Sequence, residues 1–149
     1  MNYVTIIAMA AKKVGISASL LVAICTHESG LKNINNENDK GSPSIGICQI
    51  KHESAKLLGF KGNRFALENP KINALYAAKY LKMQFDRYNN DACKAVAAYN
   101  SGTYFENKKI PGRPKNFRYV QDVQNLITDE ETSILLQCNT IETDIAKGF

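Results

Sequence analysis

Glu28 is the residue best suited to acid–base chemistry, because it follows an almost wholly apolar run, 18–25. Such a run predicts a helix that is buried on most sides. Ser17 can cap the start of this helix and Gly30 suits the left-handed residue that ends one, so Glu28 falls in the last turn. Apolar surroundings and the negative end of the helix dipole both disfavour a charged carboxyl group. Glu28 is therefore predicted to hold a proton for transfer, the alternative being an ordinary surface glutamate.

Other chemistries find little support in the residue spacing. Histidine precedes glutamate twice, at 27–28 and 52–53. A helical zinc site needs a second histidine four residues after the first, where this sequence has Leu31 and Lys56. Cys25 lies two residues before the first histidine, on another face of the helix, so no Cys-His nucleophile is expected. The sequence therefore predicts neither a metal nor another cofactor.

The composition fits a single globular domain. The chain has 149 residues, of which 44% are hydrophobic and 22% charged, which is enough for one hydrophobic core. Its formal charge of +5 favours an anionic partner, and it does not choose among nucleic acid, a membrane and an acidic cell-wall polymer. There is no run of five like charges and no Trp, so a nucleic-acid partner is not expected. No apolar stretch reaches about 18 residues, so stable membrane insertion is not expected either.

The four cysteines are widely spaced and form no CxxC pair. They are Cys25, Cys48, Cys93 and Cys138. Because an even count alone is weak evidence for pairing, the sequence favours buried free thiols over one or two disulfides.

Apolar spacing and capping residues predict helices along the chain and no convincing strand. Segments rich in glycine, proline and asparagine at 31–45, 60–69 and 102–116 are expected to be loops. Helices are expected at 3–13, 18–29, 52–58, 70–88, 92–99 and 114–127, with a milder helical pattern at 129–149. The predicted fold class is therefore all-α.

Four motifs follow one another along this helical framework. They are Glu28-Ser29, Gly46-Ile47-Cys48-Gln49, Ala98-Tyr99-Asn100-Ser101-Gly102 and Tyr119-Val120. In this order they resemble the motifs of the soluble lytic transglycosylase (SLT) domain, in the goose-lysozyme-like group of peptidoglycan-cleaving enzymes. The resemblance covers about residues 5–127. It implies a lysozyme-like single domain over 1–128, with about six to seven helices around a substrate cleft. A C-terminal helical tail at 129–149 is expected to pack on this domain or extend it.

The resemblance implies that Glu28 cleaves the β-1,4 bond between N-acetylmuramic acid and N-acetylglucosamine. As an acid it protonates the glycosidic oxygen, and as a base it then deprotonates the muramyl C6 hydroxyl. That hydroxyl attacks C1 and leaves a 1,6-anhydromuramyl end. No water enters the product, so one carboxyl group suffices.

The resemblance also implies a set of residues that bind the sugar or orient Glu28. They are Ser29, Ser42, Gln49, Tyr99, Asn100 and Tyr119. Each has a structural alternative, such as core packing or a hydrogen bond to backbone, because buried polar atoms usually find partners whatever their function. Since the chain has no Trp, an aromatic platform for sugar is expected among other rings. The candidates are Tyr99, Tyr104, Phe105 and Tyr119.

Two other functions compete with transglycosylation. A muramidase would use water, and its inverting form needs a second carboxylate roughly 6.5 to 9.5 Å from the first. Glu37, Asp39 and Glu53 are the possible partners. A non-catalytic wall-binding or structural subunit is the second alternative, and the retained Glu28 argues against it.

The expected place of action is the bacterial periplasm or cell wall. The opening residues 1–10 are apolar but have no basic n-region, because Lys12 and Lys13 come after the apolar part, so no signal peptide is evident. Delivery by a phage particle is therefore favoured, with components of a virion or a secretion channel as further partners of the chain.

Overall fold

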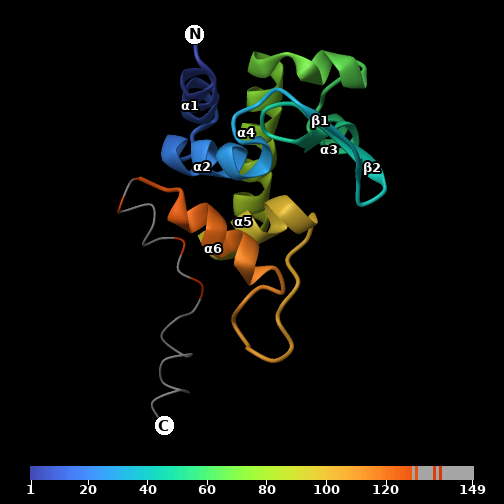
Figure 1. The fold of residues 1–149 in the computed structure, drawn as a ribbon. Coiled ribbons are helices and arrows are strands. Elements are labelled where there is room, and N and C mark those ends of the chain that lie inside the picture. The colour runs from blue at the N-terminus through green and yellow to red at the C-terminus, as the bar shows by residue number, and fades with distance from the viewer. Residues whose placement is uncertain (129, 131–135, 137, 139–149) are drawn as a thin grey trace. The chain divides into compact units, whose positions relative to one another are not determined.

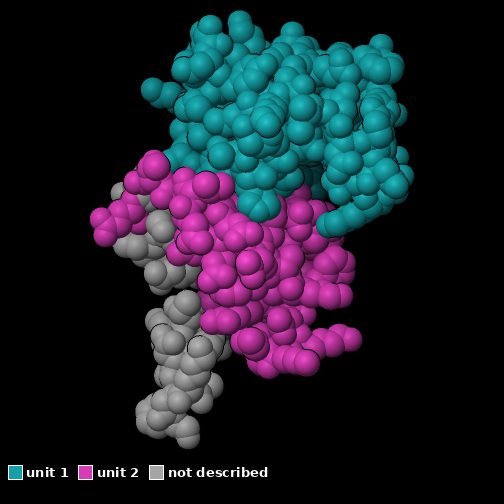
Figure 2. All heavy atoms as spheres, viewed as in Figure 1, with its two compact units in different colours: residues 1–82 teal, residues 83–149 magenta. Residues whose placement is uncertain are grey.

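The computed structural model describes residues 1–128, 130, 136 and 138, and within them it shows six α-helices and one three-stranded sheet (Figure 1). The helices are α1 (Tyr3–Val14), α2 (Ala18–Ser29), α3 (His52–Leu57), α4 (Pro70–Arg87), α5 (Ala92–Ser101) and α6 (Phe117–Asn125), with a 3-10 helix at Arg64–Glu68. The strands are β1 (Asn35–Asp39), β2 (Ser42–Ile45) and β3 (Ile50–Lys51). Figure 2 colours the two compact units of the chain, Met1–Lys82 and Met83–Phe149. The boundary between the units falls inside α4.

Capping residues fix the helix ends where the sequence predicts them. Ser17 Oγ accepts a hydrogen bond from the Leu20 N–H at 3.2 Å, and Gly30 follows α2 with a φ of 67°. Asn69 Oδ1 accepts from the Lys71 N–H at 3.0 Å at the start of α4. The predicted helices are confirmed, except that α6 begins at Phe117, because Pro114 is paired with Glu106 in an isolated β-bridge.

The segment 31–45 is not the loop that the sequence predicts, and the fold is not purely all-α. Antiparallel β1 and β2 pair Asn35 with Ile45, and β2 pairs with β3 through Ile45 and Ile50. β1 is polar and mostly exposed along its length, so it shows no alternation of apolar and polar residues. Lys40 and Gly41 both have positive φ, and they form the turn between the strands.

The expectation of free thiols is wrong. Cys25 is bonded to Cys48 in the first unit, with Cα atoms 4.3 Å apart, and Cys93 is bonded to Cys138 in the second, at 5.3 Å. All four are buried, as the sequence predicts, but they are paired. The fold brings the members of each pair together from separate elements, which their spacing in the sequence does not reveal.

Each unit has a core of small and branched apolar side chains. The largest fully buried ones in the first unit are Ile7, Leu20, Leu21, Ile24, Ile45, Ile47, Leu67 and Leu81, and the second unit buries Val96, Val120 and Leu136. Within the described part of the chain, no helix is long and apolar enough to cross a membrane. The predicted helical tail at 129–149 lies outside the described residues apart from 130, 136 and 138, and the division of the chain at 128 stays a prediction.

Candidate active site

Glu28 lies in the last turn of α2, where its side chain is half-buried. The neighbouring Ser29 is buried, and its hydroxyl forms hydrogen bonds with residues outside α2. Ser29 Oγ donates to the carbonyl of Ile47 at 2.7 Å and lies 3.2 Å from that of Cys25, and it accepts from the Lys32 N–H at 3.2 Å. The hydroxyl of Ser29 therefore holds the end of α2 to the turn that follows β2.

The disulfide between Cys25 and Cys48 makes a second link between the same two segments. Cys25 and Ser29 are four residues apart in α2, so they share one face of the helix. Their partners, Ile47 and Cys48, are adjacent in the turn. Covalent and hydrogen bonds thus fasten the last turn of α2, which carries Glu28, to the 46–49 turn.

Asn73 of α4 supports the 46–49 turn from the other side. Its Oδ1 accepts from the Cys48 N–H at 2.9 Å, and its Nδ2 donates to the carbonyls of Ile45 at 2.7 Å and Leu67 at 2.8 Å. The side chain is fully buried, and these three bonds to backbone groups give a partner to its carbonyl oxygen and to both of its N–H donors. Sequence analysis missed Asn73, although an asparagine on the apolar face of a helix is a recognisable signal.

Gly46 fits this turn because it has no side chain. Its φ is 76°, in the left-handed region. A Cβ at this position would lie 2.4 Å from Asn73 Nδ2 and 3.2 Å from the Leu67 carbonyl oxygen. A glycine is therefore required both by the conformation of the backbone and by the closeness of Asn73.

Gln49 is the last residue of the turn, and both protons of its side-chain amide are donated to backbone carbonyls. Its Nε2 donates to the carbonyls of Ile34 at 2.8 Å and Gly46 at 2.9 Å. Its φ of 53° is unusual for a residue other than glycine. The amide thus contributes to the turn, and Oε1 is the atom that Gln49 has left to accept a hydrogen bond from a hydroxyl or N–H of a sugar.

Ser42 lies at the start of β2 and accepts a hydrogen bond from Lys51 of β3. Lys51 Nζ donates to Ser42 Oγ at 2.8 Å and also to the carbonyl of Asp39. Ser42 accepts this bond, so its own proton is available to another acceptor. Lys51 therefore braces the β1–β2 hairpin from β3.

The second unit contains the other three predicted site residues. Tyr99 and Tyr119 are buried, with 7% and 8% of their surfaces exposed, and Asn100 is half-buried at the end of α5. Asn116, just before α6, donates from Nδ2 to Asn100 Oδ1 at 2.9 Å and to the Ala97 carbonyl at 3.0 Å. Asn116 thus joins the segment of Tyr99 and Asn100 to the segment of Tyr119, and sequence analysis missed it.

A buried amide from α4 also supports the end of α5. Gln84 is fully buried, and its Nε2 donates to the carbonyls of Gly102 at 3.1 Å and Ala98 at 3.4 Å. Arg87 donates to the same Gly102 carbonyl at 2.9 Å and to Thr103 Oγ1 at 2.8 Å. These bonds fix the chain that follows α5. Like Asn73, Gln84 is an amide residue on the apolar face of a helix, which is a signal that the sequence contains.

The aromatic candidates differ in how much ring they expose. Tyr99 and Tyr119 are buried, which suits packing or positioning better than stacking on a sugar. Tyr104 is half-buried, and burial together with the carboxylate of Glu106 raises the pKa of its hydroxyl to about 12. Phe105 is 53% exposed, so it offers the most open ring face of the four.

The structure therefore groups the predicted residues into three sets. Ser29, beside Glu28, is bonded to the turn that carries Gln49; Ser42 belongs to the hairpin; and Asn100 is bonded to the segment of Tyr119 through Asn116. Among the described residues, no group of three His, Cys, Asp or Glu side chains lies close enough together to hold a metal ion. The predicted site residues therefore offer one carboxyl group together with amide and hydroxyl groups.

Comparison with known proteins identifies the family of the chain. The fold is similar to that of an inactive mutant of the lytic transglycosylase Slt from Pseudomonas aeruginosa, with a TM-score of 0.59 and 22% sequence identity. The similarity covers 90% of this chain and 22% of that chain, so this chain spans only about a fifth of that protein, and it supports the lysozyme-like fold. The sequence also matches the family described as the transglycosylase SLT domain over residues 5–119. This match covers well over half of the sequence, and the chain therefore belongs to the transglycosylase SLT domain family.

Proposed function

We propose that the chain is a lytic transglycosylase that cleaves the β-1,4 bond between N-acetylmuramic acid and N-acetylglucosamine in peptidoglycan. The observation that carries the proposal is the position of Glu28, in a helix turn fastened to the 46–49 turn by Ser29 and the Cys25–Cys48 disulfide. A catalytic carboxyl group must be held in a fixed geometry to transfer a proton efficiently. The related structure from Pseudomonas aeruginosa is of an inactive mutant in which glutamine replaces a glutamate, and this supports an essential glutamate in the proposed reaction.

In the proposed reaction, Glu28 first gives its proton to the glycosidic oxygen as the bond from that oxygen to C1 breaks. The acetamido group of the muramyl residue stabilises the positive charge that develops at C1. The Glu28 carboxylate then takes the proton of the C6 hydroxyl, whose oxygen bonds to C1 and closes the 1,6-anhydro ring. The glutamate ends protonated, ready for the next bond, and no water is consumed.

The remaining predicted residues are proposed to bind the sugar or orient Glu28. Gln49 has only its Oε1 to offer, so we assign it to a hydroxyl or N–H donor of the substrate. Ser42 has its hydroxyl proton to donate, since it accepts from Lys51. Ser29, Tyr99, Asn100 and Tyr119 complete the proposed set, in which Ser29 acts by positioning the end of α2.

A hydrolytic muramidase is less well supported by the contacts of the possible second carboxylates. Glu37 forms an ion pair with Arg64 at 2.9 Å, and Asp39 Oδ2 accepts from Ser44 Oγ at 2.7 Å. Glu53 lies exposed in the first turn of α3. Two of the three candidates are thus engaged in holding the hairpin.

We further propose that the chain acts in the periplasm or cell wall, where its substrate is found. The two disulfides support this location, because disulfides form and persist in oxidising compartments outside the cytoplasm. Delivery by a phage particle and contact with virion or secretion-channel components stay predictions.

Mass spectrometry of soluble products from purified sacculi tests the proposed reaction. The wild-type chain should release anhydromuropeptides, and Glu28→Gln should lower the rate about a thousandfold, because general acid and base catalysis are both lost. Glu53→Gln makes the same change at an exposed glutamate of the same unit and should keep the wild-type rate, unless Glu53 is the second carboxylate of a hydrolase. Reducing products from the wild type would show hydrolysis instead. A wild-type rate for Glu28→Gln would exclude Glu28 as the catalytic acid.

A further inference from the structure

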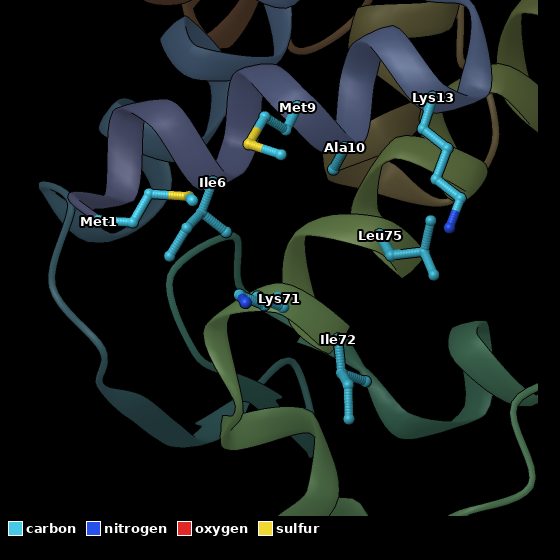
Figure 3. A pocket seen from close by; sticks show the side chains of 8 residues that line it. All are labelled: Met1, Ile6, Met9, Ala10, Lys13, Lys71, Ile72 and Leu75. Atoms are coloured by element: carbon cyan, nitrogen blue, oxygen red, sulfur yellow. The ribbon is translucent and has the colours of Figure 1, made fainter.

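The first unit contains a pocket that none of the proposed site residues line. It has a volume of about 420 Å³, within the range of small-molecule pockets. Figure 3 shows its lining, which comes from the N-terminal end of the chain, α1 and the first turns of α4. The lining residues are Met1, Ile6, Met9, Ala10, Lys13, Lys71, Ile72 and Leu75.

The interior of this pocket is apolar and adaptable. Ile6, Met9 and Ala10 lie at helical spacing on one face of α1, and Ile72 and Leu75 are three residues apart on α4. Met9 is 56% exposed although it is a large apolar side chain. Methionine is unbranched and flexible, so it adjusts to the shape of a bound chain. A lining of this kind is suited to bind a hydrocarbon chain.

Two lysines supply the charge of the pocket. Lys13 and Lys71 are exposed, one from each helix, and their aliphatic stems line the same space as the apolar side chains. Within the described part of the chain, neither ammonium group has a hydrogen-bond or ion-pair partner. No acidic residue lines the pocket. An apolar space bordered by two ammonium groups fits a ligand with a hydrocarbon chain and an anionic head.

We propose that the pocket between α1 and α4 binds a single alkyl chain that carries an anionic head group. The alkyl chain lies against the apolar side chains of both helices, and the head group meets the ammonium group of Lys13 or that of Lys71, which lie on opposite sides of the pocket (Figure 3). A free fatty acid and an anionic membrane lipid share this chemistry. The inference does not depend on the proposed transglycosylase activity, because the pocket and the proposed site share no residue.

Isothermal titration calorimetry of the full chain with dodecanoate, below its micellar concentration, tests this proposal. One dodecanoate should bind per chain, and each methylene removed from the probe should weaken binding about fourfold, as expected for buried hydrocarbon. Dodecyltrimethylammonium has the same chain with the opposite charge and should bind at least tenfold more weakly. Absence of saturable dodecanoate binding, or equal affinity for the two probes, would overturn the proposal.

Lysine variants assign the head-group contact. The double variant Lys13→Gln with Lys71→Gln removes the contact at either side of the pocket and should lose about fivefold in dodecanoate affinity, which is the loss expected for one exposed charge contact. The matched control is Lys12→Gln with Lys56→Gln, which removes the same charge at two exposed lysines outside the pocket. Equal losses in the two double variants would show nonspecific attraction to the net positive charge and would contradict the proposed site. Thermal unfolding of each variant confirms that it is folded.

A vesicle assay identifies the source of the ligand. Co-sedimentation is measured with phosphatidylcholine vesicles that contain or lack phosphatidylglycerol. If the Lys13 and Lys71 change abolishes sedimentation with the anionic vesicles, the pocket takes a lipid from a membrane surface. If dodecanoate binds and vesicles do not, it takes a free anionic amphiphile, and either result upholds the proposed chemistry.

Discussion

The 46–49 turn of the first unit and the end of α5 in the second unit are held by the same kind of residue, but not equally firmly. Each carries a proposed substrate-binding residue, Gln49 or Asn100, and each is bonded by a buried amide from α4. Asn73 makes three bonds of 2.7 to 2.9 Å to the first region. Gln84 makes two longer ones, 3.1 and 3.4 Å, to the second.

The two regions also differ in the rest of their support. The 46–49 turn has the disulfide to α2 and the buried hydroxyl of Ser29. The end of α5 depends on Arg87 and Asn116, whose bonds are exposed or half-buried. Buried bonds cost more to break than exposed ones, because water cannot replace the lost partner. The segment fastened to the turn of Glu28, the proposed catalytic residue, is thus the more rigidly built, and substitutions there should have the larger effects.

The largest effect is expected from Gly46→Ala. The new Cβ would meet Asn73 Nδ2 at 2.4 Å and would also place alanine at a positive φ. The free energy of unfolding should fall by about 4 kcal/mol, from overpacking and from backbone strain together. Urea unfolding followed by circular dichroism measures the change.

Gly41→Ala is the matched control for this prediction. Gly41 has a similar φ of 93°, and a Cβ there would meet nothing within 4 Å. Its replacement should cost only about 1 kcal/mol, from backbone strain alone. If the two variants lost equal stability, the contact with Asn73 would not be what constrains the turn.

Removal of the first disulfide should have the next largest effect. The double variant Cys25→Ala with Cys48→Ala should unfold with about 3 kcal/mol less free energy, because the bond closes a loop with a sequence separation of 23. The corresponding change at Cys93 and Cys138 removes a bond with a separation of 45 and should cost a similar amount.

Activity distinguishes the two disulfide variants. Release of anhydromuropeptides should fall more for the Cys25 and Cys48 variant, assayed at a temperature where both proteins are folded, because only that bond fastens the helix turn of Glu28. An equal loss of activity in the two variants would contradict the proposed importance of the 46–49 turn.

A smaller effect is expected from Ser29→Ala. This change removes the donor to the Ile47 carbonyl and leaves that buried oxygen without its 2.7 Å partner, which should cost about 2 kcal/mol. Thr26→Ala is the control, because the Thr26 hydroxyl donates only within its own helix, to the Val22 carbonyl. The control should lose about 0.5 kcal/mol or less in the same urea titration. Similar losses would mean that Ser29 supports α2 and not the turn.

The sequence predicts the helices well because their signals are local. Ser17, Gly30, Asn69 and Asp91 cap helices at the expected places, and each acts on residues within one turn. The strands were missed because β1 is polar and exposed, and its pairing depends on residues of β2 that follow a turn. The local pattern of apolar and polar residues in β1 does not show which segment pairs with it.

The motifs of the candidate site can be predicted from the sequence, but the residues that hold these motifs in place cannot. Glu28 and Gln49 stand in recognisable motifs, whereas Asn73, Gln84 and Asn116 act on backbone atoms far away in the sequence. The disulfides were missed for the same reason, since each joins segments that only the fold brings together. A polar residue on the apolar face of a helix is the one signal in the sequence that could have pointed to Asn73 and Gln84.

The smallest effect is expected in the second unit, from Asn116→Ala. Asn116 Nδ2 bonds Asn100 Oδ1 and the Ala97 carbonyl at a half-buried position, so water can partly replace it, and the loss should be about 1 kcal/mol. Asn116→Asp is the sharper variant, because it keeps the shape and replaces the donor by an acceptor that repels Asn100 Oδ1. If Asn116 positions Asn100 for the substrate, the aspartate variant should raise KM more than it lowers kcat, while Asn125→Ala, at an exposed residue of α6, changes neither. A loss of stability in Asn116→Asp as large as that of Gly46→Ala would show that the end of α5 is built as rigidly as the 46–49 turn, and the contrast between the two regions would fail.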